Sequence, residues 1–395
     1  MLVIEIIILS YFTFAVVHTL MFAIAGNFRR RVIEAEELRS NSMAVLIPSY
    51  KEDEVILQTA QLALQQNYPS AKFSVIVIAD SLKEATLLKL SQLPIKLIKV
   101  SFDKSTKAKS LNAAMAEIGD EYDIAVVLDA DNVMEEEFLS KINQAYNAGY
   151  VAIQGRRVAK NMNTSFAILD TISEVINNHI FRKGHTALGL SSAVIGSGMA
   201  FDYRLFKSTL DGIQAVGGFD RELQLAFIGR GQKILYLEDA IVFDEKIEKS
   251  STFENQRKRW LASQFIYLKK YFFTGVKHLF KGNYDFFHMG VLNNILLPRV
   301  LMLGLITVIT MLAVLFKNYT TLPYYFWLVL FGLYILTFFL SIPGKLYNKK
   351  LLKAIFSLPQ AFVIMFISLF KLKGANRQFI HTPHSNVKVD KSLIN

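Results

Sequence analysis

The sequence contains no cysteine among its 395 residues, and it has only two tryptophans and eight prolines. The absence of cysteine excludes a disulfide scaffold, cysteine zinc sites, thiol catalysis and iron–sulfur ligation. It does not decide the redox compartment, because a chain without cysteine suits either side of a membrane. Charged residues are also scarce at 19%, below the usual share of about a quarter.

Apolar residues are correspondingly frequent. They make up 52% of the chain, phenylalanine alone occurs 31 times, and the mean hydropathy is +0.31. These values exclude a disordered chain and are high for a soluble enzyme. Lysine and arginine outnumber the acidic residues by 44 to 33, which gives a net charge of +11. Because the basic residues lie beside apolar stretches and form no stripe, we expect a membrane surface as partner and no nucleic acid.

The first apolar stretch, residues 1–25, is long enough to cross a bilayer at about 20 residues per span. No basic residue precedes it, and Arg29, Arg30 and Arg31 follow it. A secretory signal would carry its positive charge before the apolar run, so we expect residues 1–26 to form an uncleaved anchor. The positive-inside rule then places the residues after it in the cytoplasm.

Three more apolar stretches close the chain, at residues 291–316, 322–342 and 351–370. We assign residues 288–373 to these membrane segments and residues 374–395 to a basic tail. Pro359 interrupts the last segment, which can therefore be re-entrant or interfacial instead of spanning. The number of spans and the side of the tail stay open.

The polar block between the anchor and the later apolar stretches, residues 27–252, has the size of one large domain. Short β-rich runs alternate in it with helical patterns, which predicts a doubly wound α/β sheet with ligands at the carboxyl ends of its strands. The expected strands are residues 44–48, 73–79, 95–100 and 124–128, and the expected helices are residues 52–66, 84–91 and 110–118.

Two of these strands end on carboxylates. Asp129 and Asp131 follow the strand at 124–128, and residues i and i+2 of an extended chain point the same way. Paired carboxylates suit a hard cation such as Mg²⁺, whereas an isolated D-x-D is more often a solvated turn. Asp80 ends the strand at 73–79, where it can accept hydrogen bonds from a base or ribose or cap a helix.

A basic amphipathic helix is predicted over residues 253–271, within an interfacial segment that we assign to residues 253–287. Gln256, Arg259 and Trp260 stand at i, i+3 and i+4 and therefore share one face. An arginine, an amide and an indole together suit a diphosphate and a sugar ring. The alternative is a helix that lies on the membrane with its tryptophan at headgroup level.

Taken in order, these features resemble the family-2 glycosyltransferases, in particular the membrane-integrated branch with the cellulose, chitin and hyaluronan synthases. The resemblance covers about residues 43–260. It implies a GT-A fold, a doubly wound nucleotide-sugar-binding domain flanked by transmembrane helices. Three elements match on the nucleotide side: the opening strand and nucleotide turn with Pro48, Tyr50 and Glu52, the base-contacting Asp80, and the K-A-x-A-L-N-like segment with Lys107. The D-x-D motif corresponds to Asp129 and Asp131, and the Q-x-x-R-W motif to Gln256, Arg259 and Trp260. The sugar- and acceptor-side loops correspond to residues 154–156 and to Gly196, Ser197 and Gly198.

The resemblance also implies a role for each element. Asp131 with Asp129 holds Mg²⁺ or Mn²⁺, and Asp129, Arg259 and Trp260 lie in the nucleotide-sugar site, with Trp260 also toward the acceptor. The family's T-E-D base motif is altered here, because residues 217–219 run straight into Asp220 without the Thr-Glu. Family spacing downstream of Asp220 is kept, so we expect Asp220 to be the catalytic base, with Glu222 as the alternative. After the last apolar stretch, residues 381–384 resemble the T-P-[KR] element of this branch.

The expected activity is inverting transfer from a nucleotide diphosphate sugar, with a UDP-sugar as the expected donor, to a glycan or lipid-linked acceptor. A polysaccharide synthase fits this expectation. The alternatives are a single-sugar transferase to a lipid acceptor and a silent membrane partner that binds nucleotide sugar. A glycoside hydrolase would need no metal or basic diphosphate helix, and a transporter would need more polar residues in its spans. The expected location is a bacterial inner membrane with the catalytic domain in the cytoplasm, in contact with membrane lipids.

Overall fold

A computed structural model describes residues 2–28, 39–213, 217–248 and 250–372 of the chain. Its centre is one mixed eight-stranded sheet in the order β3-β2-β1-β4-β7-β6-β8-β5. The strands are β1 Met43–Tyr50, β2 Phe73–Asp80, β3 Lys96–Val100, β4 Ile124–Val127, β5 Val133–Met134, β6 Ala152–Ala159, β7 Met199–Asp202 and β8 Leu235–Asp244. The arginines at 29–31 and the tail with residues 381–384 lie outside the described residues.

The four strands predicted from the sequence form one parallel half of the sheet, which confirms that part of the prediction. β1 pairs in parallel with β2 and with β4, and β2 pairs in parallel with β3. The other half is mixed, because β7 runs antiparallel to both β4 and β6. The carboxyl ends of β1, β2 and β4 therefore meet at one edge of the sheet.

Helices cover both faces of this sheet, as a doubly wound arrangement requires. Alternate residues of each strand enter two separate cores: Ala44 and Leu46 pack on one face, whereas Val45 and Ile47 pack on the other. Helices α4, α8 and α9 cover the first face, and α2, α3 and α5 cover the second. Their bounds are α2 Ile56–Ala63, α3 Glu84–Leu90, α4 Lys107–Glu117, α5 Phe138–Asn147, α8 Tyr203–Leu210 and α9 Phe219–Gly229, with a 3₁₀ turn, η1, at Ser70–Lys72.

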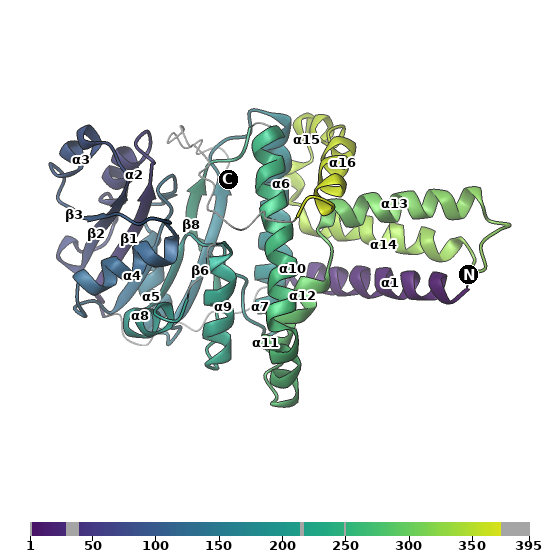
Figure 1. Cartoon of the computed structure of the whole chain (residues 1–395), viewed down its shortest axis with the longest axis horizontal. Helices are drawn as coiled ribbons and strands as arrows, with labels where there is room; N and C mark the ends of the chain where they lie inside the picture. The colour runs from purple at the N-terminus through teal and green to yellow at the C-terminus, as the bar shows by residue number, and fades with distance from the viewer. Residues whose placement is uncertain (1, 29–38, 214–216, 249, 373–395) are drawn as a thin grey trace.

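Two long helical segments separate this domain from the apolar helices (Figure 1). The first runs through α6 Ser165–Asn177, η2 Asn178–Gly184 and α7 His185–Ala187, and the second is α10 Ser250–Phe280, longer than the predicted 253–271. The chain continues through α11 Tyr284–Phe287, η3 His288–Leu292 and α12 Asn293–Ile295. In Figure 1, α6 and α10 run across the direction of the apolar bundle, as a platform between bundle and domain.

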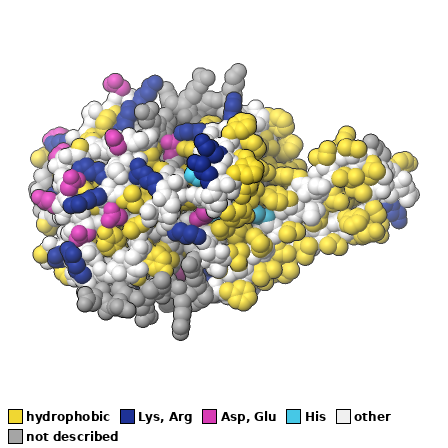
Figure 2. Space-filling model, turned by 90° about the horizontal axis from the view of Figure 1, so that it is seen from below, with side chains coloured by type: hydrophobic (Ala, Val, Ile, Leu, Met, Phe, Trp, Pro, Cys, Tyr) yellow, Lys and Arg dark blue, Asp and Glu magenta, His cyan; other side chains and the backbone are white. Residues whose placement is uncertain are grey.

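The apolar bundle consists of α1 Leu2–Ala25, α13 Arg299–Leu315 and α14 Tyr325–Ser341, which project side by side from the platform (Figure 1). A shared core joins them, with Val16 of α1, Ile306 of α13 and Tyr334 of α14 buried together. Figure 2 shows apolar side chains over this bundle and the charged side chains concentrated on the domain. The remaining helices, α15 Lys349–Ile355 and α16 Leu358–Leu369, lie at its base after a 3₁₀ turn, η4, at Gly344–Leu346.

Among the described residues, α1 is the one unbroken helix that is long and apolar enough to cross a membrane, with 24 residues and a mean hydropathy of 2.0. Two bent pairs reach that criterion together: α11–α12 with α13, bent by 52°, and α15 with α16, bent by 42°. Pro359 lies in the first turn of α16, at the bend. Helix α14 is apolar but has only 17 residues.

Helix α1 contacts the platform at a position where a side chain would not fit. A Cβ atom added to Gly184 would lie 2.3 Å from the backbone oxygen of Phe22. We expect Gly184→Ala to lower the unfolding free energy by about 1–3 kcal/mol, because backbone atoms cannot move aside as a side chain can. Thermal melting in detergent measures this effect. Gly332→Ala is the matched control, since a Cβ at Gly332 meets no atom within 4 Å, and an equal effect of both variants would contradict the prediction.

Candidate active site

The edge formed by the ends of β1 and β2 has an unusual backbone. Tyr50 is paired with Asp80 at the last position of the two strands. The residues that follow, Lys51 and Ser81, both have φ of 58°, in the left-handed region that side chains rarely adopt. The Lys51 N–H donates to the Asp80 backbone oxygen at 3.1 Å and so joins the two turns. Strained backbone of this kind is concentrated at functional sites.

The Asp80 carboxylate is only partly satisfied by the protein. The side chain is 1% exposed, and one oxygen accepts the Ser81 hydroxyl at 2.9 Å. The other oxygen is buried and has no hydrogen-bond partner among the described residues. Leaving a buried acceptor without a donor costs about 1–3 kcal/mol, and more for a charged group. This oxygen is therefore suited to accept an N–H or O–H from a ligand.

Three predicted motifs meet at the end of β4. The Asp129 N–H donates to the Ser197 hydroxyl at 2.9 Å. The Lys107 ammonium at the start of α4 binds the Asp129 carboxylate and also donates to the Gly196 backbone oxygen at 2.6 Å. Gly198 has a φ of 63°, and a Cβ there would lie 2.9 Å from Val242, so glycine is required at this position. The structure thus joins Lys107 and Gly196, which are 89 positions apart in the chain.

Asp131 lies deeper than Asp129, and its side chain is 5% exposed. The ammonium group of Lys160, at the end of β6, donates to the Asp131 backbone oxygen. Burial lowers the pKa of Lys160, against the opposing effect of Asp131 and Asp244. Sequence reasoning did not single out Lys160, because nothing in the sequence brings the end of β6 next to the D-x-D.

The two D-x-D carboxylates fit a divalent cation by the chemistry of their donors. Hard cations take carboxylate oxygens, and Mg²⁺ is often held by only one or two of them, with substrate phosphates and water completing its shell. The described residues contain no cluster of three or more His, Asp or Glu side chains arranged as a cation cage. Asp129 and Asp131 would therefore hold the ion together with the phosphates of a bound substrate.

A buried charge network is centred on Glu174 of α6. The Glu174 carboxylate on α6 pairs with Arg157 at 2.7 Å, with Arg182 at 3.0 Å and with Lys246 at 3.8 Å. Burial by itself would raise the pKa of Glu174, but these three cations hold it well below its ordinary value. Because its pKa is depressed in the folded state, Glu174 contributes stability above the ordinary carboxylate pKa. That contribution is lost as the pH falls toward the folded-state value.

Glu174→Gln should lower the unfolding free energy at pH 7 by about 3 kcal/mol or more, since it leaves buried cations without their anion. The difference from the wild type should shrink as the pH falls below about 4, where the unfolded-state carboxylate is protonated. Thermal melts of both proteins in detergent across this pH range test the prediction. Glu117→Gln is the control, because Glu117 is exposed on α4, and it should change the thermal midpoint little. If the destabilisation by Glu174→Gln does not depend on pH, the ionised Glu174 carboxylate is not its cause.

The two candidate bases lie in the first turn of α9. The Glu222 carboxylate is buried and forms an ion pair with Lys270 of α10. Asp220 is half-buried, just after Gly218, whose φ is 75°. The Tyr267 hydroxyl of α10 donates to the Gly217 backbone oxygen at 2.6 Å, which fixes this turn against the platform. The ion pair leaves Asp220 as the more available carboxylate.

The Q-x-x-R-W residues lie on α10, at the platform. Trp260 is 42% exposed, whereas burial lowers the pKa of Arg259. The Gln256 side-chain oxygen is buried without a hydrogen-bond partner among the described residues. The sequence reasoning missed Arg257, which lies 4.3 Å from the Trp260 ring centroid and pairs with Asp170 of α6 at 2.5 Å. Arg257 therefore ties this motif to the other platform helix.

The predicted residues thus form three groups. Pro48, Tyr50, Glu52 and Asp80 lie on β1, β2 and their turns, and Lys107, Asp129, Gly196, Ser197 and Gly198 meet at the end of β4 with Asp131 beneath. Asp220, Gln256, Arg259 and Trp260 lie on α9 and α10. Hydrogen bonds connect Lys107, Asp129, Gly196 and Ser197 of the β4 group directly. Helices α9 and α10 are connected to each other by the hydrogen bond from Tyr267 to the turn at Gly217.

The mixed α/β sheet, with carboxylates at its strand ends, is a GT-A-like glycosyltransferase fold. The sequence model described as "Glycosyltransferase like family 2" matches residues 40–263, more than half of the chain. The chain therefore belongs to glycosyltransferase family 2. The finer assignment to the cellulose and chitin synthase branch stays a prediction.

Individual relatives are distant. A Bacillus subtilis (strain 168) protein named "Probable glycosyltransferase YdaM" is 25% identical over 279 residues, which are 63% of this chain and 63% of that protein. The chain thus covers less than two thirds of that relative. The mannosyltransferase PcManGT from Pyrobaculum calidifontis, solved with GDP-Man and Mn²⁺, has a TM-score of 0.52 and 14% identity over 83% of this chain and 94% of its own. At this identity the likeness shows the fold alone.

Proposed function

We propose that the protein is a membrane-bound inverting glycosyltransferase that moves a sugar from a nucleotide diphosphate sugar to a glycan or a lipid-linked acceptor. The observation that carries this proposal is the assembly of Lys107, Asp129 and the loop at Gly196–Ser197 at the end of β4. An ammonium group and a carboxylate pair that can hold a divalent cation together suit a diphosphate, because both cations would contact its oxygens. The nucleotide sugar GDP-Man bound by PcManGT supports this class of donor.

The nucleotide would lie across the ends of β1 and β2. Asp80 offers a buried, unbonded oxygen to an N–H of the base, such as the imide N–H of uracil. Tyr50, Pro48 and Glu52 border the same edge. A UDP-sugar is therefore our proposed donor, and the identity of the base is a direct test of the role of Asp80.

Departure of the diphosphate needs compensation for its growing negative charge. Mg²⁺ or Mn²⁺ on Asp129 and Asp131 would supply Lewis-acid stabilisation of that group when bound. Lys107 is already held against Asp129 and can contact the same phosphates. Arg259 adds a second cation from α10. Gln256 and Trp260 would orient the sugar and the acceptor, together with the loop from Gly196 to Gly198.

Asp220 would act as the general base. In an inverting displacement, the acceptor oxygen forms the new bond to the anomeric carbon while the bond to the diphosphate oxygen breaks. Asp220 takes the hydroxyl proton of the acceptor in that step. The Glu222 carboxylate is occupied by Lys270, which supports Asp220 over Glu222 in this role.

We also propose that α1, α13 and α14 cross a membrane and that the domain lies on its cytoplasmic side. The apolar surface of the bundle and the platform that runs across its base support this placement. In this arrangement the tips of the bundle lie on the far side, while α15 and α16 lie at the surface next to the domain. A bacterial inner membrane is the proposed location.

The activity is tested by incubating purified full-length protein in lipid nanodiscs with a panel of labelled nucleotide sugars and Mg²⁺ or Mn²⁺. Transfer to a polymer or lipid, dependent on one nucleotide sugar and on the cation, supports the proposal. Product length separates a processive polysaccharide synthase from a single-sugar transferase. Binding of a nucleotide sugar without any turnover would instead indicate a silent partner, and cation-independent cleavage of an oligosaccharide would indicate a hydrolase.

A further inference from the structure

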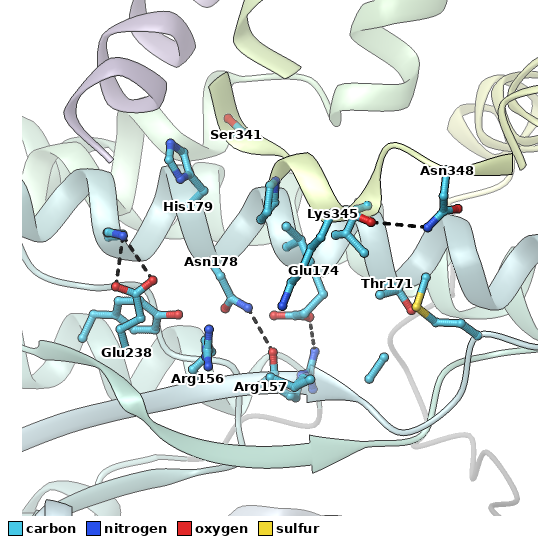
Figure 3. A pocket seen from close by; sticks show the side chains of 18 of the residues that line it. Arg156, Arg157, Thr171, Glu174, Asn178, His179, Glu238, Ser341, Lys345 and Asn348 are labelled. Atoms are coloured by element: carbon cyan, nitrogen blue, oxygen red, sulfur yellow. Dashed lines mark hydrogen bonds and ion pairs between the residues drawn. The ribbon is translucent and has the colours of Figure 1, made fainter. Parts of the chain in front are cut away.

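A cavity of about 340 Å³ lies where the catalytic domain meets the apolar bundle (Figure 3). Its sides are β6 and β8, α6 with η2, and the turn between α14 and α15. We call it the junction cavity. It is separate from the proposed donor site, because Asp80, Asp129, Asp131 and Lys107 are not among the residues that line it.

The junction cavity carries an excess of positive charge. Five cationic side chains line it, against the two carboxylates of Glu174 and Glu238, which gives an excess of three. Lys183 pairs with Glu238 at 3.0 Å, and Arg157 pairs with Glu174 at 2.7 Å. The other three cations of the lining are Arg156, Lys345 and Lys350. In Figure 3, Arg156 lies on the domain side and Lys345 on the bundle side.

Two polar groups in the wall are buried without a partner. Tyr236 is 6% exposed, and its hydroxyl has no hydrogen-bond partner among the described residues. The Arg156 Nε is also buried and makes no hydrogen bond within the described part of the chain. Both groups are donors, and burying an unused donor costs about 1–3 kcal/mol. An anion with several oxygens would satisfy both at once.

The uncharged part of the lining is mixed: Met162, Val175 and Leu346 form an apolar wall, and the other polar residues are Thr171, Asn178, His179, Ser341 and Asn348. The cavity also adjoins Ser341, the last residue of α14, at the end of that helix that contacts the platform. If the bundle crosses a bilayer, this end lies at headgroup height. The cavity thus combines cations and hydrogen-bond donors with an apolar wall at the depth where a lipid presents its phosphate next to its chains.

We propose that the junction cavity binds the phosphate headgroup of an anionic membrane lipid. Arg156, Lys345 and Lys350 supply charge, the Tyr236 hydroxyl donates to a phosphate oxygen, and the apolar wall receives the first methylenes of the chain. The lipid can be a bilayer phospholipid or a phosphorylated polyprenol that serves as acceptor, since both present this chemistry. The inference rests on the proposed membrane placement, but it does not require that sugar transfer occur.

The test measures binding to the full-length protein after delipidation in neutral detergent, without nucleotide sugar. The probes are dihexanoyl phosphatidylglycerol, dihexanoyl phosphatidylcholine and inorganic phosphate. We expect phosphatidylglycerol to bind at least about tenfold more tightly than either of the others. Lys345→Gln combined with Lys350→Gln should weaken it about tenfold or more, because each basic residue near an anionic lipid contributes about 1 kcal/mol.

Lys349→Gln is the matched control, because Lys349 is an exposed lysine on the same helix that does not line the cavity. It should leave binding unchanged, whereas Tyr236→Phe should weaken it several-fold while removing only one hydroxyl. Equal binding of phosphatidylcholine or inorganic phosphate would overturn the proposal. So would unchanged phosphatidylglycerol binding by the double variant.

A second arm identifies the source of the phosphate. A short-chain polyprenyl phosphate is added with labelled nucleotide sugar and the cation. Glycosylation of this lipid, with a KM raised by the double variant, shows that an acceptor lipid binds in the junction cavity before its phosphate reaches the donor site. If phosphatidylglycerol binds and no glycosylated polyprenyl phosphate forms, the occupant of the junction cavity is a bilayer lipid. Failure of all sugar transfer, with lipid binding retained, would contradict the proposed function and leave the lipid site standing.

Discussion

Asp220→Asn is expected to bind nucleotide sugar as the wild type does and to transfer sugar about 10²–10⁴-fold more slowly. The amide keeps the size of the carboxylate but cannot take the acceptor proton. A loss confined to kcat is the signature of a group that acts only in the transition state. The measurement pairs donor affinity from calorimetry with initial rates of transfer.

Glu222→Gln is the matched control for this prediction, because Glu222 stands two residues further along the same helical turn. Its carboxylate already pairs with Lys270. Glu222→Gln should lower the unfolding free energy, because the ion pair is lost. It should lower kcat far less than Asp220→Asn does. If Glu222→Gln stops transfer and Asp220→Asn does not, the roles are reversed and Glu222 is the base.

Asp131→Ala should abolish the cation-dependent part of nucleotide-sugar binding. A cation that bridges a carboxylate and a diphosphate contributes several kcal/mol, so we expect affinity in Mn²⁺ to fall by about 10²-fold or more. Affinity in the presence of a chelator should change little, because Asp80 and the β1 turn are untouched. Calorimetric titration with a nucleoside diphosphate, with and without Mn²⁺, measures both values.

Asp103→Ala serves as the control for Asp131→Ala, since Asp103 is an exposed aspartate in the loop before α4. It should retain the full response to Mn²⁺. An Asp131→Ala variant that still gains affinity from Mn²⁺ would show that the cation is held elsewhere. Folding of each variant is checked by its thermal midpoint.

The parallel half of the sheet could be predicted from the sequence for a physical reason. Strands buried on both faces are continuous apolar runs, such as 124–128, and their carboxyl ends collect at one edge, where Asp80 and Asp129 lie. Short motifs then identified Lys107 and the Gly196–Ser197 loop. The structure brings them together: Lys107 binds the Asp129 carboxylate, and the Asp129 N–H donates to the Ser197 hydroxyl.

Other parts of the site could not be predicted, because they depend on long-range packing. Lys160 reaches Asp131 only through the position of β6 beside β8, and Arg257 reaches Trp260 and Asp170 only once α10 lies against α6. The junction cavity joins β6 to a turn nearly two hundred positions later. A pattern along the chain carries no signal for such contacts.

Strand β6 connects two regions that have been described separately. Arg156 near its middle lines the junction cavity, and Lys160 just beyond its end holds the backbone of Asp131. A ligand that shifts β6 at Arg156 would also shift Lys160, four residues further along the chain, and with it the backbone of Asp131. Thermodynamic linkage then requires reciprocity: whatever factor a bound lipid imposes on donor affinity, the donor must impose on lipid affinity. The composition of the surrounding bilayer would in that way set the donor concentration at which the enzyme works.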